Sequence, residues 1–330
     1  MRTILRTARN AVKRLRPAPV ILMYHRIAEP TFDPWGLAVS PHHFEEQLDI
    51  LLCRREPLAM SEFAKRLKQG RLSARAVAIT FDDGYVDNLR AALPSLADRE
   101  IPATLFLATH SVGQRVEYWW DELCRLILGR QDRLDAVIRI GGEEVALTLE
   151  PLSDPMESAT WRAFNPPATT RQVLYLTLWN KMRPLENNPR EAVMAELRVL
   201  FGSGTPASQD LPMSAAEIRD LVAGGTVALG GHSTTHPILP RLSPAEQRRE
   251  ILEGKAVCEA LAGHPIDGFA YPYGELSADT KALVQESGFD WACSTRQARV
   301  NRMDTDYFDL PRIQVTNMPA DAFQAALSLI

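Results

Sequence analysis

Three absences narrow the range of proteins that this sequence of 330 residues can encode. The four cysteines include no CxxC pair, and such scattered cysteines are typical of reduced thiols in the cytoplasm rather than of a disulfide framework. The apolar run from Val20 to Tyr24 is too short to cross a bilayer. The formal net charge of −4 shows no basic excess, so we expect no binding to nucleic acid.

Residues 1–17 form a basic N-terminal segment. No acidic residue occurs in 1–16 and no apolar segment of a secretory signal follows, so we expect a cytoplasmic protein. On a helix, the aliphatic side chains of residues 1–16 would share one face, with the cations elsewhere. Two interpretations remain open: a solvated terminal segment, or a helix that lies on the inner face of the membrane and contacts anionic lipid.

The sequence contains a regular alternation of short apolar runs with helical patterns. Its hydrophobic fraction of 45% is enough for a substantial core. Strands are predicted at 20–24, 77–81, 103–108, 226–229, 268–271 and 291–293, and helices at 42–53, 61–70, 88–99, 243–261 and 277–287. Ser214 and Ser243 each precede a glutamate by three residues, which predicts a capping box at two helix starts. The alternation predicts parallel strands joined by helices, and therefore an α/β fold.

The alternation is interrupted between residues 112 and 211. Two apolar runs flank Gly141-Gly142 there, which predicts a hairpin, and helical patterns follow at 171–182 and 190–201. We interpret 112–211 as an inserted α+β subdomain. The main α/β domain would then consist of two segments, 18–111 and 212–330.

Polar side chains follow four of the predicted strands. They occur in Tyr24-His25-Arg26, Asp82-Asp83-Gly84, His232 to His236, and Tyr271-Pro272-Tyr273-Gly274. Because the carboxyl ends of parallel strands in an α/β barrel share one rim, we expect these groups to converge. Two adjacent carboxylates are costly to hold together unless a cation or a catalytic role requires them. The set indicates a metal site with one carboxylate and two imidazoles as ligands, and one carboxylate left as a base.

The chain resembles the NodB-type polysaccharide deacetylases, a family of metal-dependent carbohydrate deacetylases. The resemblance covers residues 18–111 and 212–315 and rests on TFDDG at Thr80–Gly84, HSTTHP at His232–Pro237 and YPYG at Tyr271–Gly274. MYHRI at Met23–Ile27 recurs in a subset of that family. The resemblance implies a distorted (β/α) barrel, here with the inserted α+β subdomain.

The resemblance also implies that Asp83, His232 and His236 hold a divalent metal, with Zn²⁺ the expected ion. Two imidazoles and one carboxylate leave positions on Zn²⁺ for water and substrate, and such an ion lowers the pKa of its water towards about 7. By the same resemblance, Asp82 is the general base that takes a proton from this water. The backbone N–H of Tyr273 would stabilise the oxyanion.

Two positions depart from the pattern of that family. Ala270 stands where many members have an arginine that pairs with the catalytic aspartate. The late Leu-x-His motif, which supplies the acid in many members, has no histidine here, because the corresponding residues are Leu310 to Ile313. We expect His25 to replace the acid, with a structural role at the rim as the alternative. Arg312 is the candidate for the displaced cation that orients Asp82.

Aromatic residues are the candidates for sugar binding. Trp119 and Trp120 lie in the insertion, and Tyr271 lies in the third motif. Aromatic faces stack on sugar rings, so we expect these three residues to contact substrate. The alternative is that the two tryptophans form the core of the insertion.

These observations predict a metal-dependent hydrolase that removes an N-acetyl or other acyl group from a sugar in bacterial cell-envelope glycan biosynthesis. A cytoplasmic location favours lipid-linked or nucleotide-linked sugars over exported polymer. Two alternatives remain open. One is a deformylase or other hydrolase of non-peptide C–N bonds on the same fold, and the other is a non-catalytic sugar-binding relative.

Overall fold

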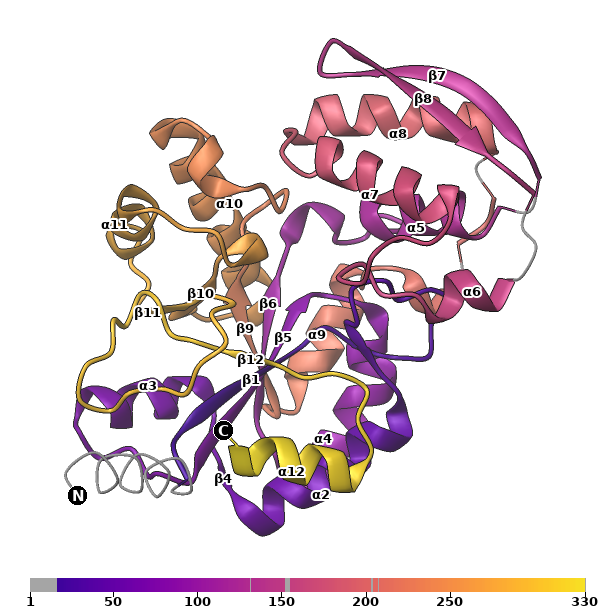
Figure 1. Ribbon diagram of the computed structural model, residues 1–330. Helices are drawn as coiled ribbons and strands as arrows, with labels where there is room; N and C mark the ends of the chain where they lie inside the picture. Colours follow the sequence, from indigo (N-terminus) through magenta and orange to yellow (C-terminus); the bar gives the residue numbers. More distant parts are fainter. Residues whose placement is uncertain (1–16, 131, 152–154, 203, 207, 330) are drawn as a thin grey trace, which may run out of the picture.

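A computed structural model describes residues 17–329, apart from 131, 152–154, 203 and 207 (Figure 1). The helix predicted within residues 1–16 lies outside these described residues. All four cysteines are unpaired thiols, as the sequence predicts. None of the described helices is long and apolar enough to cross a membrane.

A parallel sheet lies at the centre of the described chain. Its strand order is β11-β10-β9-β6-β5-β1-β12, with β4 paired to β5. The strands are β1 Val20–Tyr24, β4 Glu56–Pro57, β5 Ala76–Asp83, β6 Ala103–Leu107, β9 Val227–Gly231, β10 Gly268–Ala270, β11 Trp291–Cys293 and β12 Ile313–Gln314. All of these pairings are parallel. The curled sheet confirms the predicted distorted (β/α) barrel.

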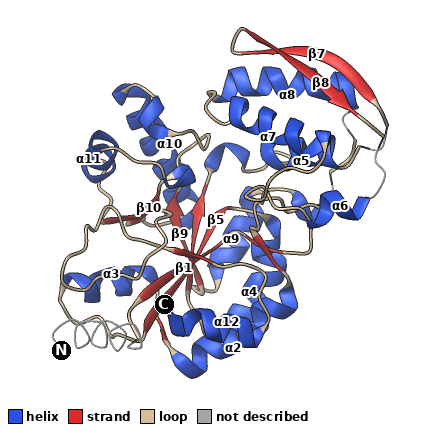
Figure 2. Cartoon of the chain, viewed as in Figure 1, coloured by secondary structure: helices blue, strands red, loops and turns tan. Residues whose placement is uncertain are grey.

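Helices pack around this sheet (Figure 2). They are α2 Pro41–Arg54, α3 Met60–Lys68, α4 Leu93–Asp98, α9 Ala215–Ala223, α10 Pro244–Ala262, α11 Ala278–Glu286 and α12 Ala320–Leu329. A π-helical turn, Asn88–Ala92, leads directly into α4. Both predicted capping boxes are confirmed, since Ser214 and Ser243 each accept a hydrogen bond from the backbone of the glutamate three residues on.

The side chains of β5 belong to two separate apolar clusters. Alternate residues of β5 point to opposite faces, so Val77, Ile79 and Phe81 pack under the outer helices. Ala76 and Ala78 contribute to a second cluster, which also contains Trp291 and residues of α3. A Cβ atom on Gly268 would lie 2.0 Å from the Trp291 ring, so only glycine lets β10 and β11 pair in this register.

The inserted region builds its own apolar cluster. It contains α5 Trp119–Leu128, the antiparallel hairpin of β7 Leu134–Ile140 and β8 Glu143–Leu149, α6 Pro155–Thr160, α7 Thr170–Met182 and α8 Asn187–Phe201. In Figure 1 these elements lie together beyond the carboxyl ends of β5 and β6. The side chains of the cluster come from this region except for Tyr85, which follows β5. The hairpin is confirmed, and the boundaries 112 and 211 stay a prediction.

Several elements were not predicted from the sequence, among them β12, α5 and α12. Strand β12 has two residues, too few to show any periodicity. Helix α5 begins within the aromatic cluster at Trp119, and α12 lies near the C-terminus. Another small parallel pair, β2 Arg26–Ile27 with β3 Ala38–Val39, closes the loop after β1. Strand β12 matters most for the site, because it pairs with β1 and follows Arg312 directly.

Candidate active site

Asp82 and Asp83 end the longest strand of the central sheet. All eight residues of β5 are buried, and both carboxylates lie at its carboxyl end. The strand ends at Asp83, which has a left-handed φ of 76°, and Gly84 follows with a φ of 108°. A Cβ atom on Gly84 would lie 2.5 Å from the Leu107 side chain. The backbone therefore turns sharply at Asp83, and the two carboxylates face different surroundings.

Backbone strain is concentrated at this end of the sheet. Five non-glycine residues of the described chain have positive φ, and four of them lie here: Asp83, Ser233, His236 and Tyr273. Such conformations cost roughly 1–3 kcal/mol each and persist only where the surroundings enforce them. The carboxylate of Glu250 on α10 accepts hydrogen bonds from the backbone of Thr234 and Thr235, at 3.0 and 2.8 Å. Helix α10 therefore holds the loop that carries His232 and His236 in place.

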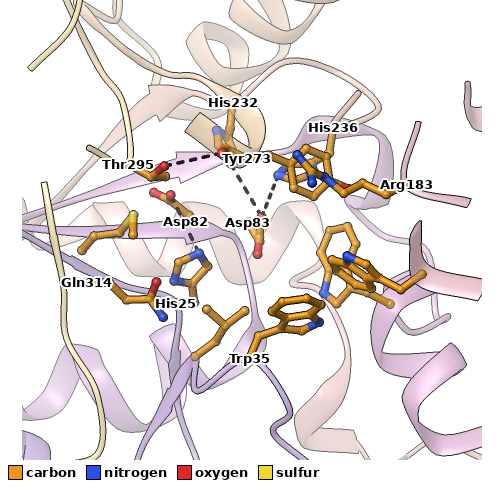
Figure 3. Close-up of a pocket in the computed structure, with 14 residues that line it drawn as sticks. His25, Trp35, Asp82, Asp83, Arg183, His232, His236, Tyr273, Thr295 and Gln314 are labelled. Carbon is orange, nitrogen blue, oxygen red and sulfur yellow. Dashed lines mark hydrogen bonds and ion pairs between the residues drawn. The ribbon is translucent and has the colours of Figure 1, made fainter. Parts of the chain in front are cut away.

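Three buried side chains converge on one point (Figure 3). The Oδ1 atom of Asp83 lies 3.7 Å from Nε2 of His232 and 3.5 Å from Nε2 of His236. One ligand atom from each residue lies within 4.8 Å of the others. The structure therefore brings together the three residues that were predicted to bind metal.

The donor atoms of this cluster fit a divalent metal. A backbone carbonyl can only accept, so Nδ1 of His232, which lies 2.7 Å from the Ala270 oxygen, carries the proton and leaves a lone pair on Nε2. Oδ1 of Asp83 is buried without a hydrogen-bond partner among the described residues.

Burial, and then the charge of Asp82, raise the pKa of Asp83 well above its usual value. Burial lowers the pKa of both histidines. A cation would supply the missing charge, and two nitrogens with one oxygen suit Zn²⁺.

Asp82 has the opposite environment from Asp83. Nη1 and Nη2 of Arg312 donate to its two carboxylate oxygens at 2.6 and 2.7 Å, and both residues are buried. Nε of Arg312 donates to the Ser294 carbonyl at 3.0 Å, which fixes the guanidinium plane. Burial acts to raise the pKa of Asp82, but the charge and hydrogen bonds of Arg312, together with His232 and His25, outweigh burial and hold this pKa below its usual value. The predicted displaced cation therefore does lie on Asp82, carried by the segment that leads into β12.

His25 faces Asp82 from the end of β1. Its Nε2 atom lies 4.0 Å from Oδ2 of Asp82, and its side chain lines the cavity described next. Burial lowers the pKa of His25 to about 4, an effect that the charge of Asp82 only partly offsets. The imidazole is therefore neutral at pH 7, and it must take up a proton before it can act as an acid.

A cavity of about 290 Å³ opens over these residues. This volume is at the low end of the range for small-molecule sites. Besides Asp82, Asp83, His25 and the two histidines, its lining includes Trp35, Trp120, Trp179, Arg183, Tyr273, Thr295 and Gln314. Tyr273 has a φ of 58°, and its ring meets the His236 ring edge-on at 4.5 Å between centroids.

The aromatic candidates divide among three environments. Trp120 lines the cavity, lies 5.1 Å from the His236 ring and donates from Nε1 to the Tyr85 hydroxyl at 2.7 Å. Trp119 stacks on Trp179 and lines a different cavity. Tyr271 is fully buried, and its hydroxyl donates to the Phe308 carbonyl at 2.9 Å. The expectation that Tyr271 contacts substrate is therefore not supported, because the alternation of the chain after β10 turns its ring into the core.

Several cavity residues had no signal in the sequence. Trp35 lies in the loop between β2 and β3, and its Nε1 donates to the Tyr175 hydroxyl at 2.8 Å. Its ring lies 4.7 Å from that of Trp179 on α7. The helical period predicts α7 but not which of its faces reaches the barrel. Arg183, at the end of α7, places its guanidinium 4.8 Å from the Tyr273 ring centroid and pairs with Glu275.

Comparison with known proteins relates this chain to polysaccharide deacetylases. The family model for polysaccharide deacetylases matches residues 69–130 and 199–292, which include all three motifs and leave out most of the insertion. YxkH of Bacillus subtilis, which is named as a polysaccharide deacetylase, is 35% identical over 107 residues. That match covers 32% of this chain and 37% of YxkH.

Two solved structures resemble the whole fold. The deacetylase PplD of Streptococcus pyogenes has a TM-score of 0.58 at 16% identity, covering 94% of this chain and 97% of PplD. IcaB of Ammonifex degensii has a TM-score of 0.57 at 20% identity, covering 95% of this chain and 98% of IcaB. The chain thus has the distorted (β/α) barrel of these deacetylases, and its three motifs lie within the stretches that match the polysaccharide deacetylase family model.

Proposed function

We propose that this protein hydrolyses the amide of an N-acylated sugar, with acetyl as the expected acyl group. One observation carries the proposal: a three-ligand metal cluster and an arginine-paired carboxylate share one cavity. The relatives are named for deacetylation, which supports the same reaction here. A divalent ion such as Zn²⁺, held by Asp83, His232 and His236, would polarise the acyl carbonyl and lower the pKa of water towards about 7.

The remaining groups divide the proton transfers between them. Asp82 stays ionised because Arg312 is paired with it, so it can accept a proton from water at the cavity floor. His25 is neutral and lies 4.0 Å from Asp82. We assign His25 to take the proton that Asp82 has accepted from water and to pass it to the departing amine. The backbone N–H of Tyr273 is assigned to the oxyanion, because the residue lies at the cavity wall beside His236.

The size and walls of the cavity support a single sugar unit as substrate. Trp35 and Trp179 form one aromatic wall and Trp120 another, and aromatic rings offer flat apolar faces to a sugar. The insertion supplies Trp179 and Arg183 and so narrows the site from one side. A terminal sugar on a lipid or nucleotide carrier suits such a site better than the interior of a polymer. The role in cell-envelope glycan biosynthesis is part of this proposal, as is a contact of residues 1–16 with the membrane.

Acyl release from a panel of sugars tests the proposal. We expect acetate from an N-acetylated sugar, with loss of activity in chelator and recovery on addition of Zn²⁺. Release of formate from N-formyl sugars, without acetate, would instead support the deformylase alternative. No acyl release from any sugar, together with no bound metal, would support the non-catalytic alternative. Retention of all three ligands and of the Asp82–Arg312 pair argues against that last outcome.

A further inference from the structure

A second cavity, of about 300 Å³, lies beside the catalytic one. The two share Trp120 and His236 as a common wall. The second cavity lies between the barrel and the insertion, because its lining includes Thr234 and Thr235 on one side and residues of α5 and α8 on the other. None of the roles assigned above uses this space.

A buried arginine in this lining has no strong partner. Arg190 on α8 is 3% exposed, and none of the described carboxylates forms an ion pair with it. Its three hydrogen bonds are all long: 3.4 Å to the Leu185 carbonyl, 3.5 Å to Oδ1 of Asn187 and 3.3 Å to the Thr235 carbonyl. Its guanidinium also lies 5.2 Å from the Trp119 ring centroid. Burying a cation with so little compensation is unfavourable.

The other buried arginines of the described chain have short contacts with carboxylates or carbonyls that compensate their charge. Arg312 and Arg26 are paired with carboxylates, with at least one contact of 2.6 Å each. Arg171 has no carboxylate partner, yet it donates to two carbonyls at 3.0 and 2.6 Å. Arg55 does the same at 2.8 and 3.0 Å. Arg190 is the exception, and it lines a cavity beside the active site.

The other charges of the cavity do not neutralise Arg190. Glu117 and Glu191 also line it, but Glu117 is paired with Arg125 and Glu191 with Arg198. Side chains that can donate hydrogen bonds also line the cavity, namely those of Ser111, Gln114, Asn187 and His110. Helix α8 begins at Asn187, so its positive end also faces this space. The lining therefore offers one uncompensated cation with several hydrogen-bond donors.

We propose that this second cavity binds a phosphate group, with the Arg190 guanidinium as its main contact. Phosphate presents several acceptor oxygens, and the planar guanidinium matches two of them at once. The group could be inorganic phosphate or the phosphate of a sugar ester, since both present the same oxygens. The proposal does not rest on the deacetylase activity, because binding is measured without turnover.

Titration calorimetry with inorganic phosphate and with N-acetylglucosamine 1-phosphate tests the proposal. Chelator-treated protein is used, so that phosphate cannot bind to a metal in the catalytic cavity. We expect saturable binding, weakened at least about tenfold in Arg190→Met, because a charge-assisted contact is lost. Arg139→Met on the exposed hairpin serves as the control and should bind like the wild type. Tighter binding of the sugar ester than of inorganic phosphate would identify an ester as the ligand, and equal affinity would identify the free ion.

Two further variants keep the test decisive if Arg190→Met does not fold. Asn187→Ala and His110→Ala alter side chains at the opening and leave Arg190 in place, and each should weaken binding several-fold. The proposal is overturned if neither phosphate compound binds to the chelator-treated wild-type protein. It is equally overturned if binding is the same in the wild type and in all folded variants of Arg190, Asn187 and His110.

Discussion

Asp82 and Asp83 are neighbours in the sequence with opposite environments. Asp82 accepts two short hydrogen bonds from Arg312, which lower its pKa. Asp83 faces two imidazoles, its Oδ1 has no partner among the described residues, and its pKa is raised. One carboxylate is thus held as an anion by the protein itself, whereas the other needs an added cation. The comparison shows that surroundings, rather than residue type, give the two carboxylates opposite shifts in pKa, as the proposed roles of base and metal ligand require.

The largest effect on metal affinity and activity is expected from Asp83, the proposed metal ligand. Asp83→Asn keeps the shape of the side chain but removes the negative charge, so metal affinity should fall by more than about 100-fold and activity with it. Metal content after dialysis, together with acyl release, measures both. Glu62→Gln, on the exposed face of α3, is the control. Full metal content in Asp83→Asn would contradict the ligand assignment.

Removing Arg312, which is paired with Asp82, should lower the stability of the protein as well as its rate of turnover. Arg312→Met leaves Asp82 buried and unpaired, at a cost of about 3–5 kcal/mol in the free energy of unfolding. Urea unfolding at pH 7 measures this cost. Adding Asp82→Asn in the same chain removes the stranded charge and should recover part of the loss. No recovery in the double variant would show that Arg312 acts mainly by packing.

The same pair predicts the pH dependence of stability. The folded-state pKa of Asp82 is below its usual value, so its contribution is present above the unfolded pKa of about 4 and is lost as pH falls through the folded pKa. Unfolding between pH 6 and pH 3 should therefore show a steeper loss of stability in the wild type than in Asp82→Asn. Parallel curves for the two proteins would contradict the lowered pKa.

His25→Ala should slow turnover by about 100-fold without releasing metal, because it removes a proton-transfer group and no ligand. His42→Ala changes an exposed histidine and is the matched control. Acyl release at saturating sugar, together with metal content, gives both readouts. A rate near that of the wild type would remove His25 from the acid role.

The smallest effect is expected at the aromatic wall. Trp179→Ala removes one stacking surface, worth about 0.5–1.5 kcal/mol, so KM for the sugar should rise by roughly two- to tenfold with little change in kcat. Val173→Ala lies on an exposed part of the same helix and is the control. An unchanged KM would show that the substrate does not contact this wall.

The sequence predicts some parts of this account and not others, for physical reasons. Strand periodicity and capping residues are local signals, so the barrel strands and the starts of α9 and α10 are predicted closely. Motifs at strand ends predict the convergence of Asp83, His232 and His236, because parallel strands share one rim. Arg312 is only a candidate in the sequence, since its position depends on β12, a strand of two residues.

The aromatic residues show the limit of such reasoning. Trp35 and Trp179 reach the cavity through the packing of the insertion on the barrel, and no periodicity in either segment reports that contact. Tyr271 is adjacent to the cavity in sequence but turned into the core in space. Local patterns therefore predict the cluster of candidate metal ligands well and the aromatic wall of the cavity poorly.

The division of roles between the two carboxylates is tested most directly by the metal content and turnover of Asp82→Asn. The account predicts that this variant keeps the metal content of the wild type, because Asp83 and both histidines are unchanged. Its acyl release should fall by about 10²–10⁴-fold, since the base is lost. Loss of metal from Asp82→Asn, or turnover like that of the wild type, would contradict the account.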